Sequence, residues 1–373
     1  MSEVPFGGMF GDIFNALGQQ GPDAWFETAK QLALTVARGE DGDPNPDPPS
    51  RQRLEEVAPL VARHVDTILS VVTRSDVTAT NRTGLTLAAL EQWKPFITPA
   101  IEAPAPVSDD LDMTGAAAMA QIAATIGPLF TGFQLGSVAG HFSERAWSLA
   151  VLPLPRTSSE RLLVVNNIAA FSQAWSLDVN AVTIFALAQE FVASVILTQP
   201  GTGDALRALL LDAVRDSLAV QGDLMTRLQS MVNPADLASL MGNPEQLLEG
   251  LEIPDETPAI RAINAATSVL SAVFDAAAHE VTGKILGPSP QLVEAYRRHR
   301  FTDARGEDAA GALFGVSTQG EHHELASRFV ATLQEKHTLS VFSALLRVDG
   351  LPSATELEDP LAWYERVTNS PLA

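Results

Sequence analysis

The chain has 373 residues, and 46% of them are hydrophobic, so it can bury a large core and is not a disordered chain. Its formal net charge is −21, with 24 Lys and Arg against 45 Asp and Glu, which argues against nucleic acid or an anionic membrane surface as a partner. The sequence has no Cys, which excludes disulfides and thiolate zinc sites and agrees with a cytoplasmic location.

The N-terminal elements are expected in the following order. Residues 1–20 are rich in Gly and Phe and are predicted to form a flexible leader, with no secretory signal, ahead of a helical domain over 21–373. A first helix is predicted from about 23 to 38 by the period of its apolar residues. An acidic, Pro-rich connector follows over 39–50.

Two further helices are expected before a long uncharged run. The apolar spacing predicts a helix over 53–72 and a shorter one over 85–93. The shorter helix is expected to end at the Pro-rich stretch 95–106, because proline removes a backbone donor and clashes within a helix.

The run from Met113 to Ser143 contains no Asp, Glu, Lys or Arg and is long enough to span a bilayer. Its content is mostly small residues, and Gly132, Gly136 and Gly140 recur every four positions. Such a stripe lets two helices approach closely in membranes and in soluble cores. We expect a buried pair of helices in a soluble protein, with a membrane-associated helical protein as the alternative.

The middle of the chain centres on an apolar helix predicted from Val179 to Leu197. A periodic segment over 158–175 precedes it, and an amphipathic helix over about 205–220 follows it. The Gly-rich turn between these two helices suggests a softer boundary within the domain, near 200–203.

The C-terminal part carries clear helix-start signals. Thr257 and Pro258 begin a helix that is expected to stop near Gly283. Ser353 and Glu356 have the spacing of a capping box, and a last short helix follows it. No segment alternates convincingly as a strand does, so the predicted fold class is all-α, a single domain of many packed helices.

Glu190 is the one charged residue in the apolar helix over 179–197. Burying a lone carboxylate costs several kcal/mol unless it is paired, protonated or bound to a metal. A zinc helix of the form His-Glu-x-x-His would supply such a reason, but Gln189 and Ala193 stand at its two His positions. We therefore expect Glu190 to be a buried remnant, satisfied by Arg145, by a His or by neighbouring hydroxyls, and no longer a working general base.

Asp275 and His279 lie four residues apart and would share one face of a helix. Together with Glu190 they are weak candidates for a rebuilt metal site, and the simpler interpretation is an ion pair between them. Two other patterns are read as structural: the alternating acids from Asp41 to Asp47 as a solvated linker, and His322-His323 as an exposed pair.

Several separated stretches, in this order and spacing, resemble one known family. They are 5–8, 135–140, 167–171, the Glu190 helix over 179–197, 296–300 and Leu351-Pro352-Ser353-Ala354-Thr355-Glu356-Leu357-Glu358-Asp359-Pro360. The family is the actinobacterial zincin-like family labelled zinc-dependent metalloprotease or hydrolase, a branch of which is associated with biosynthesis of a deazaflavin cofactor. The resemblance covers essentially the whole chain.

This resemblance implies a mostly helical zincin-like fold, with the degenerate metal helix at 189–193 buried in the core. It also implies Asp275 as the position to align with a third ligand. Because both motif histidines are replaced, no cofactor is expected, and zinc is expected only if an unorthodox ligand set exists. The family's fold transfers better than its activity.

Three functions therefore stand open on the sequence. The leading one is a non-catalytic zincin-like protein that binds a peptide or protein partner in a degenerate cleft between the Glu190 helix and the glycine-striped helix. The second is a metal-dependent hydrolase or peptidase with an unorthodox ligand set. The third is the membrane-associated protein. The sequence names neither the partner nor the oligomeric state.

Overall fold

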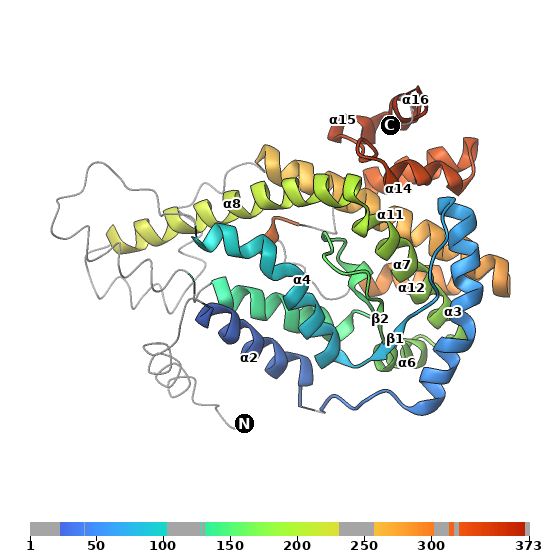
Figure 1. The fold of residues 1–373 in the computed structure, drawn as a ribbon, viewed down its shortest axis with the longest axis horizontal. Helices are drawn as coiled ribbons and strands as arrows, with labels where there is room; N and C mark the ends of the chain where they lie inside the picture. The colour runs from blue at the N-terminus through green and yellow to red at the C-terminus, as the bar shows by residue number, and fades with distance from the viewer. Residues whose placement is uncertain are drawn as a thin grey trace.

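The computed structural model describes residues 23–40, 42–102, 128, 131–230, 257–301, 313–316 and 321–369 (Figure 1). The helices are α2 (Ala24–Arg38), α3 (Pro48–Leu69), α4 (Arg82–Glu102), α6 (Val165–Ala174), α7 (Val179–Thr198), α8 (Pro200–Ser230), α11 (Pro258–Leu286), α12 (Pro290–Phe301), α14 (Glu321–Lys336), α15 (Ala354–Glu358) and α16 (Pro360–Asn369). Residues 131–145 form a further helix. The remaining elements are the 3-10 helices η1 (Leu149–Val151) and η2 (Leu339–Leu346) and the strands β1 (Thr78–Thr80) and β2 (Leu162–Val164).

The all-α prediction is confirmed, because the described residues form a multi-helix domain whose only strands are the two short ones. The predicted leader, residues 1–20, lies outside the described residues, as do 113–127 of the long uncharged run.

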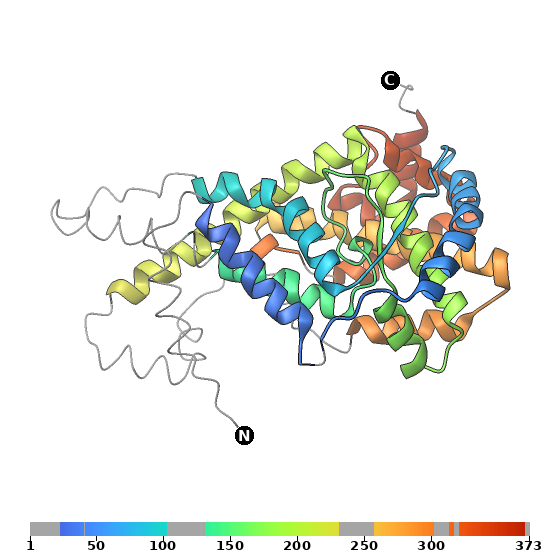
Figure 2. The ribbon, with the colours of Figure 1, turned by 60° about the horizontal axis from the view of Figure 1, so that its bottom comes forward.

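Helix α7 is the centre of the core. Every residue from Ala181 to Leu197 is buried, because α11, α3, α6 and α8 pack around it (Figures 1 and 2). Asp178 caps its N-terminus by accepting a hydrogen bond from the backbone N–H of Asn180. A helix that is hydrophobic on all sides must be surrounded, and α7 is surrounded by protein.

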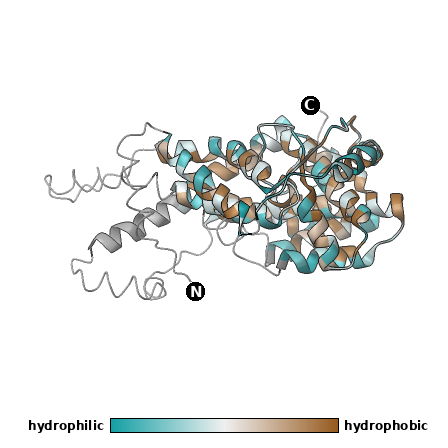
Figure 3. Cartoon of the chain, turned by 90° about the horizontal axis from the view of Figure 1, so that it is seen from below, coloured by the Kyte–Doolittle hydropathy of each residue, from teal (hydrophilic) through white to brown (hydrophobic). Residues whose placement is uncertain are grey.

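Among the described residues, α7 is also the helix long and apolar enough to cross a membrane. Its apolar window is 89% buried inside the protein, as expected for the core helix of a packed domain. Hydropathy follows the same arrangement in the other described helices, since many of them turn a polar side to solvent and an apolar side to their neighbours (Figure 3).

The glycine stripe faces α2. A Cβ on Gly132 would lie 2.4 Å from the carbonyl oxygen of Trp25, and one on Gly136 would lie 2.6 Å from that of Ala29. At Gly140 the nearest atom is the Cβ of Val36, also at 2.6 Å. The backbones of the two helices therefore meet where only hydrogen atoms fit. Helix α2 therefore covers the glycine face of this helix, and the cleft predicted between this helix and α7 stays a prediction.

Three elements differ from the sequence-based expectation in the first half of the chain. Helix α4 continues through Pro95 and Pro99 to Glu102, where the sequence predicted a link. Strand β1 pairs in parallel with β2, with Thr78 opposite Leu162. Strand β1 lies between the helices predicted over 53–72 and 85–93, and β2 lies inside the periodic segment over 158–175, where no strand was expected. Strands as short as these are held in place by the surrounding structure more than by the β-propensity of their own residues.

The second half follows the predicted helix starts more closely. Thr257 caps α11 by accepting from the N–H of Ile260, and Ser353 and Glu356 make a full capping box at α15. Helix α11 ends at Leu286, one turn later than expected, and Gly287 adopts a φ of 92° there. Helix α8 begins at Pro200, directly after α7, so the Gly-rich turn near 200–203 is the first turn of a helix.

Candidate functional site

Glu190 is fully buried and engaged on both oxygens. Arg156 Nη1 donates to Glu190 Oε1 at 2.6 Å, and Arg156 Nη2 donates to Oε2 at 3.0 Å. The relative exposure of the two side chains is 2% for Arg156 and 0% for Glu190. A two-point pair of this kind is the strongest way for protein groups to satisfy a carboxylate. The partner is Arg156, not Arg145, which was the cation considered from the sequence.

Gln189 is fixed by a hydrogen bond on each side of its amide. Trp147 Nε1 donates to Gln189 Oε1 at 2.9 Å, and Gln189 Nε2 donates to Asp275 Oδ1 at 2.6 Å. Ala193, at the other position of the metal motif, is fully buried and has no polar group to offer. Both positions therefore serve packing and hydrogen bonding within the core.

Asp275 lies beside Gln189 and pairs with Arg300. Arg300 Nη1 donates to Asp275 Oδ2 at 2.7 Å, and Arg300 Nη2 reaches Ser271 Oγ at 3.4 Å. Burial raises the pKa of the Asp275 carboxyl, while Arg300 and Gln189 oppose that shift. The expected ion pair with His279 is wrong, because His279 is exposed and Asp275 is bound to Arg300.

An aromatic cluster surrounds the Gln189 side of the helix. Trp147 stacks on Tyr296 with ring centroids 4.9 Å apart, and Phe171 meets His299 edge-on at 4.9 Å. Arg145 Nη2 lies 2.7 Å from His299 Nδ1, so that nitrogen acts as the acceptor of the guanidinium proton. Burial, with a smaller contribution from Arg145, lowers the pKa of His299 to about 4 and keeps the ring neutral near pH 7.

The sequence missed the groups that satisfy the core carboxylates. Arg156 was not singled out, and the run 297–300 was noted only for its resemblance. A signal was present, because a carboxylate on an apolar helix needs a cation, a proton or a metal to satisfy it. The cations lie 34 and 25 positions away along the chain, too far for helical spacing to identify them.

Two patterns were read as structural in the sequence, namely the acids from Asp41 to Asp47 and the pair His322-His323. The reading holds for the acids and needs one correction for the histidines. Asp43 accepts hydrogen bonds from the N–H groups of Arg82 and Thr83 at the start of α4, and Asp47 caps α3. His322 and His323 are half-buried, not an exposed pair. Burial and the nearby Arg300 lower the pKa of His323 to about 4.

These residues do not fit a zinc ion. Zinc in proteins takes about three side-chain ligands, preferably imidazole, thiolate or carboxylate. The motif helix offers an amide and a methyl group at the ligand positions, and the two nearby carboxylates are each bound to a guanidinium. Across the described part of the chain, three or more His, Asp or Glu side chains nowhere converge as a metal site would require.

Comparison with known proteins gives one family and one fold. The family model described as zincin-like metallopeptidase matches residues 25–364. A crystal structure from Chloroflexus aurantiacus, described as a "putative hydrolase with a novel fold", superposes with a TM-score of 0.59 at 16% identity, covering 92% of this chain and 99% of that one. A search of curated proteins returned no match. At that identity the superposition shows a shared fold only.

Proposed function

The chain belongs to the zincin-like metallopeptidase family, and from this premise we propose that it is a non-catalytic member that acts by binding a peptide or protein partner. The observation that carries the proposal is the two-point pair between Arg156 and Glu190. In a working zinc helix the Glu takes a proton from a water that the metal activates. Here both carboxylate oxygens accept from a guanidinium, and the side chain has no exposed surface.

The charges around the helix support the same proposal. Arg156 and Arg300 already provide a positive group at each of the two carboxylates near the motif. A divalent cation would have to enter beside two guanidinium groups, and like charges repel strongly where water is excluded. The proposed setting is the cytoplasm, and the strongly acidic chain favours neutral or basic partners.

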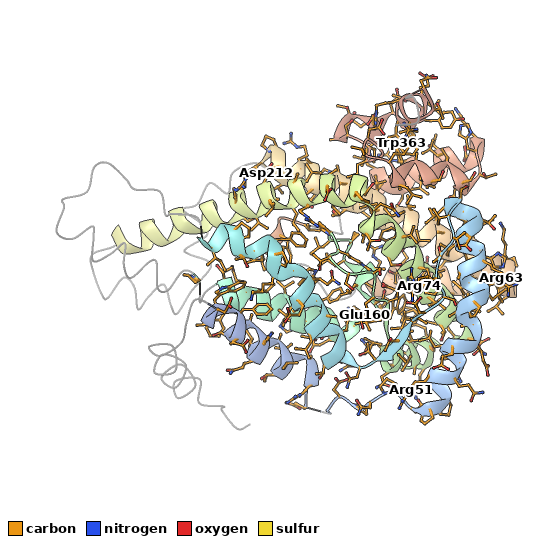
Figure 4. All side chains as sticks on the ribbon, in the orientation of Figure 1. Arg51, Arg63, Arg74, Glu160, Asp212 and Trp363 are labelled. Atoms are coloured by element: carbon orange, nitrogen blue, oxygen red, sulfur yellow. The ribbon has the colours of Figure 1, made fainter. Side chains whose placement is uncertain are left out.

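Elemental analysis tests the loss of the metal. Protein purified without chelator is expected to contain well under one equivalent of zinc, and adding zinc should not produce peptide hydrolysis. Asp212→Asn, which changes an exposed acid on α8 far from the motif, serves as the control for non-specific metal uptake (Figure 4). Stoichiometric zinc that disappears when Glu190, Asp275 or His279 is replaced would instead establish the metal-dependent hydrolase.

A further inference from the structure

A solvent-open hollow lies beside α3, and neither Glu190 nor Asp275 belongs to its lining. It has a volume of about 630 Å³ and is lined by α3, by the segment over 73–78 and by Glu160 and Arg161. Pockets that hold small ligands or peptide ends have volumes in this range. Arg74 and Glu160 mark its position in Figure 4.

Arg161 is the buried cation of this hollow, with 7% of its surface exposed. Its Nε donates to Ser194 Oγ at 2.6 Å, and its Nη1 donates to the carbonyl oxygen of Arg74 at 2.9 Å. The guanidinium also lies over the ring of Phe191, 4.9 Å from its centroid. These contacts fix the group on α7, one turn beyond Glu190.

The Nη2 of Arg161 has no acceptor among the described residues, where the contacts of this side chain come from Nε and Nη1. It is also not one of the enclosed polar atoms that lack a partner, so it keeps contact with solvent. Arg161 lines the hollow, and a guanidinium nitrogen facing it would supply a hydrogen-bond donor that carries positive charge.

The positive charge of Arg161 is incompletely balanced. Arg156 is matched by Glu190, and Arg74 is matched by Asp76 at 2.8 Å. The carboxylate oxygen nearest to Arg161 is that of Asp76, at 4.0 Å from Nη1. Burial lowers the pKa of Arg161, and Asp76 and Glu190 offset that shift only in part. A buried guanidinium of this kind gains from an added anion.

The remaining charges of the hollow restrict what that anion can be. Glu55 and Glu160 are exposed acids in the lining, whereas Asp76 is paired with Arg74, which also lines the hollow. A phosphate, with its greater negative charge, would be repelled by the two glutamates. A single carboxylate suits one free guanidinium nitrogen, and a basic group next to it would suit the two glutamates.

We propose that this hollow binds the C-terminal carboxylate of a partner peptide that has a basic residue next to its end. Arg161 Nη2 holds the carboxylate, and Glu55 and Glu160 receive the basic side chain. This assignment rests on the proposed function, because it identifies the partner as a peptide end. It places the binding site one turn along α7 from Glu190, which the peptide does not reach.

Fluorescence anisotropy with labelled peptides tests the assignment. The probes are fluorescein-Ala-Ala-Lys-Ala with a free carboxylate, the same peptide as its C-terminal amide, and fluorescein-Ala-Ala-Glu-Ala with a free carboxylate. The acid form of the Lys peptide is expected to bind at least about tenfold more tightly than either of the others, as loss of one charged hydrogen bond implies. Equal binding of acid and amide, or no binding of any probe, would overturn the proposal.

Variants separate the two halves of the site. Arg161→Lys should reduce binding of the acid about tenfold and bring it to the level of the amide. Glu55→Gln with Glu160→Gln should abolish the preference for the Lys peptide over the Glu peptide, whereas the control Asp212→Asn should change nothing. If Arg161→Lys does not fold, the acid and amide probes on the wild-type protein still decide the matter. Tight binding of the amide would show that the acids alone capture a cation, and the carboxylate assignment would be wrong.

Zinc content and hydrolysis of the same peptides are measured on the same sample. A protein that lacks zinc and binds none of the probes contradicts the peptide-end assignment and leaves the non-catalytic proposal standing. A protein with stoichiometric zinc that cleaves the peptides contradicts the proposed function itself.

Discussion

At the scale of single residues, Arg156 and Glu190 place two opposite charges inside an apolar core. The gain from their attraction roughly offsets the cost of removing both from water, so the pair adds little net stability. Removing one partner is different, because the other charge stays buried without compensation. The Nε of Arg156 already has no acceptor among the described residues, so the guanidinium depends on Glu190 for its satisfaction.

Glu190→Gln is therefore expected to lower the free energy of unfolding by about 3–5 kcal/mol. The double variant Glu190→Gln with Arg156→Met should recover a large part of that loss, because no charge is left unpaired. Chemical denaturation of both variants measures the difference, with Glu365→Gln on the surface of α16 as the control. A Glu190→Gln variant as stable as the wild type would contradict the role of the pair.

The two histidines with lowered pKa values predict a pH dependence. His299 and His323 have pKa values of about 4 in the fold, whereas an unfolded chain has about 6.5. Between these values the unfolded chain binds protons that the folded one does not, so stability falls as the pH drops from about 6.5 towards 4. Asp275, with its raised pKa, acts in the opposite direction.

Replacing both histidines with Gln isolates their contribution. The double variant is expected to lose less stability than the wild type between pH 7 and pH 5, by about 1–2 kcal/mol after allowance for their partial exposure. Urea unfolding at the two pH values measures this quantity. Parallel losses in both proteins would mean that other groups set the pH dependence.

Local sequence patterns predicted where the two carboxylates lie. An acid within an apolar helix predicted burial at Glu190, and helical spacing placed Asp275 on a helix. Neither pattern could name Arg156 or Arg300, because a contact across 34 or 25 positions is fixed by how whole helices pack. The replacement of both His positions of a zinc helix by Gln189 and Ala193 was, in contrast, readable from the sequence, because the spacing of that pattern lies within one helix.

At the scale of elements, the contact between α2 and the helix over 131–145 depends on glycine. Gly136→Leu is expected to lower stability by about 1–3 kcal/mol or more, because even a Cβ would lie 2.6 Å from the carbonyl oxygen of Ala29. Gly136→Ala should lower it by a smaller amount. Thermal unfolding of both variants against the wild type measures the effect.

Gly283 in α11 provides the matched control. A Cβ there would meet nothing within 4 Å, so Gly283→Ala should raise stability by about 0.5–1 kcal/mol through the better helix propensity of Ala. If Gly136→Ala also stabilised the protein, the two helices would be farther apart than the structure has them.

Elements were predictable where their signals are local. Apolar period and capping residues located α2, α7, α11 and α15 closely. The end of α4 was not predictable from local signals. Pro95 and Pro99 each remove one backbone hydrogen bond, but they do not disturb the packing of the residues between them. Phe96 and Ile97 between them are fully or almost fully buried, and that burial holds the helix through both prolines.

At the scale of the whole molecule, the segments before and after residue 200 interlock. Helix α11 packs against α7 and α3, α8 packs against α4, and η2 packs against α3. Thr202 Oγ1 also donates to the carbonyl oxygen of Leu345. Contacts of this kind join the segments on the two sides of the softer boundary that the sequence suggested near 200–203, and that boundary stays a prediction.

The protein is therefore expected to unfold in one cooperative transition. Calorimetry should give a calorimetric enthalpy equal to the van't Hoff enthalpy. A second transition that Gly201→Ala shifts on its own would show two units. This substitution is a sharp probe, since a Cβ on Gly201 would lie 2.5 Å from the backbone of Arg347 in the C-terminal part.

The two-point pair between Arg156 and Glu190 also limits which single substitutions this sequence can accept without losing stability. Gln189→His alone would give up the amide bonds to Trp147 and Asp275 while a guanidinium still holds Glu190. Removing Arg156 alone would strand a buried carboxylate, and Ala193→His alone would force a ring into a packed core. Each of these substitutions costs stability before a bound ion could offset the loss, so each first change towards a His-Glu-x-x-His helix is destabilising by itself.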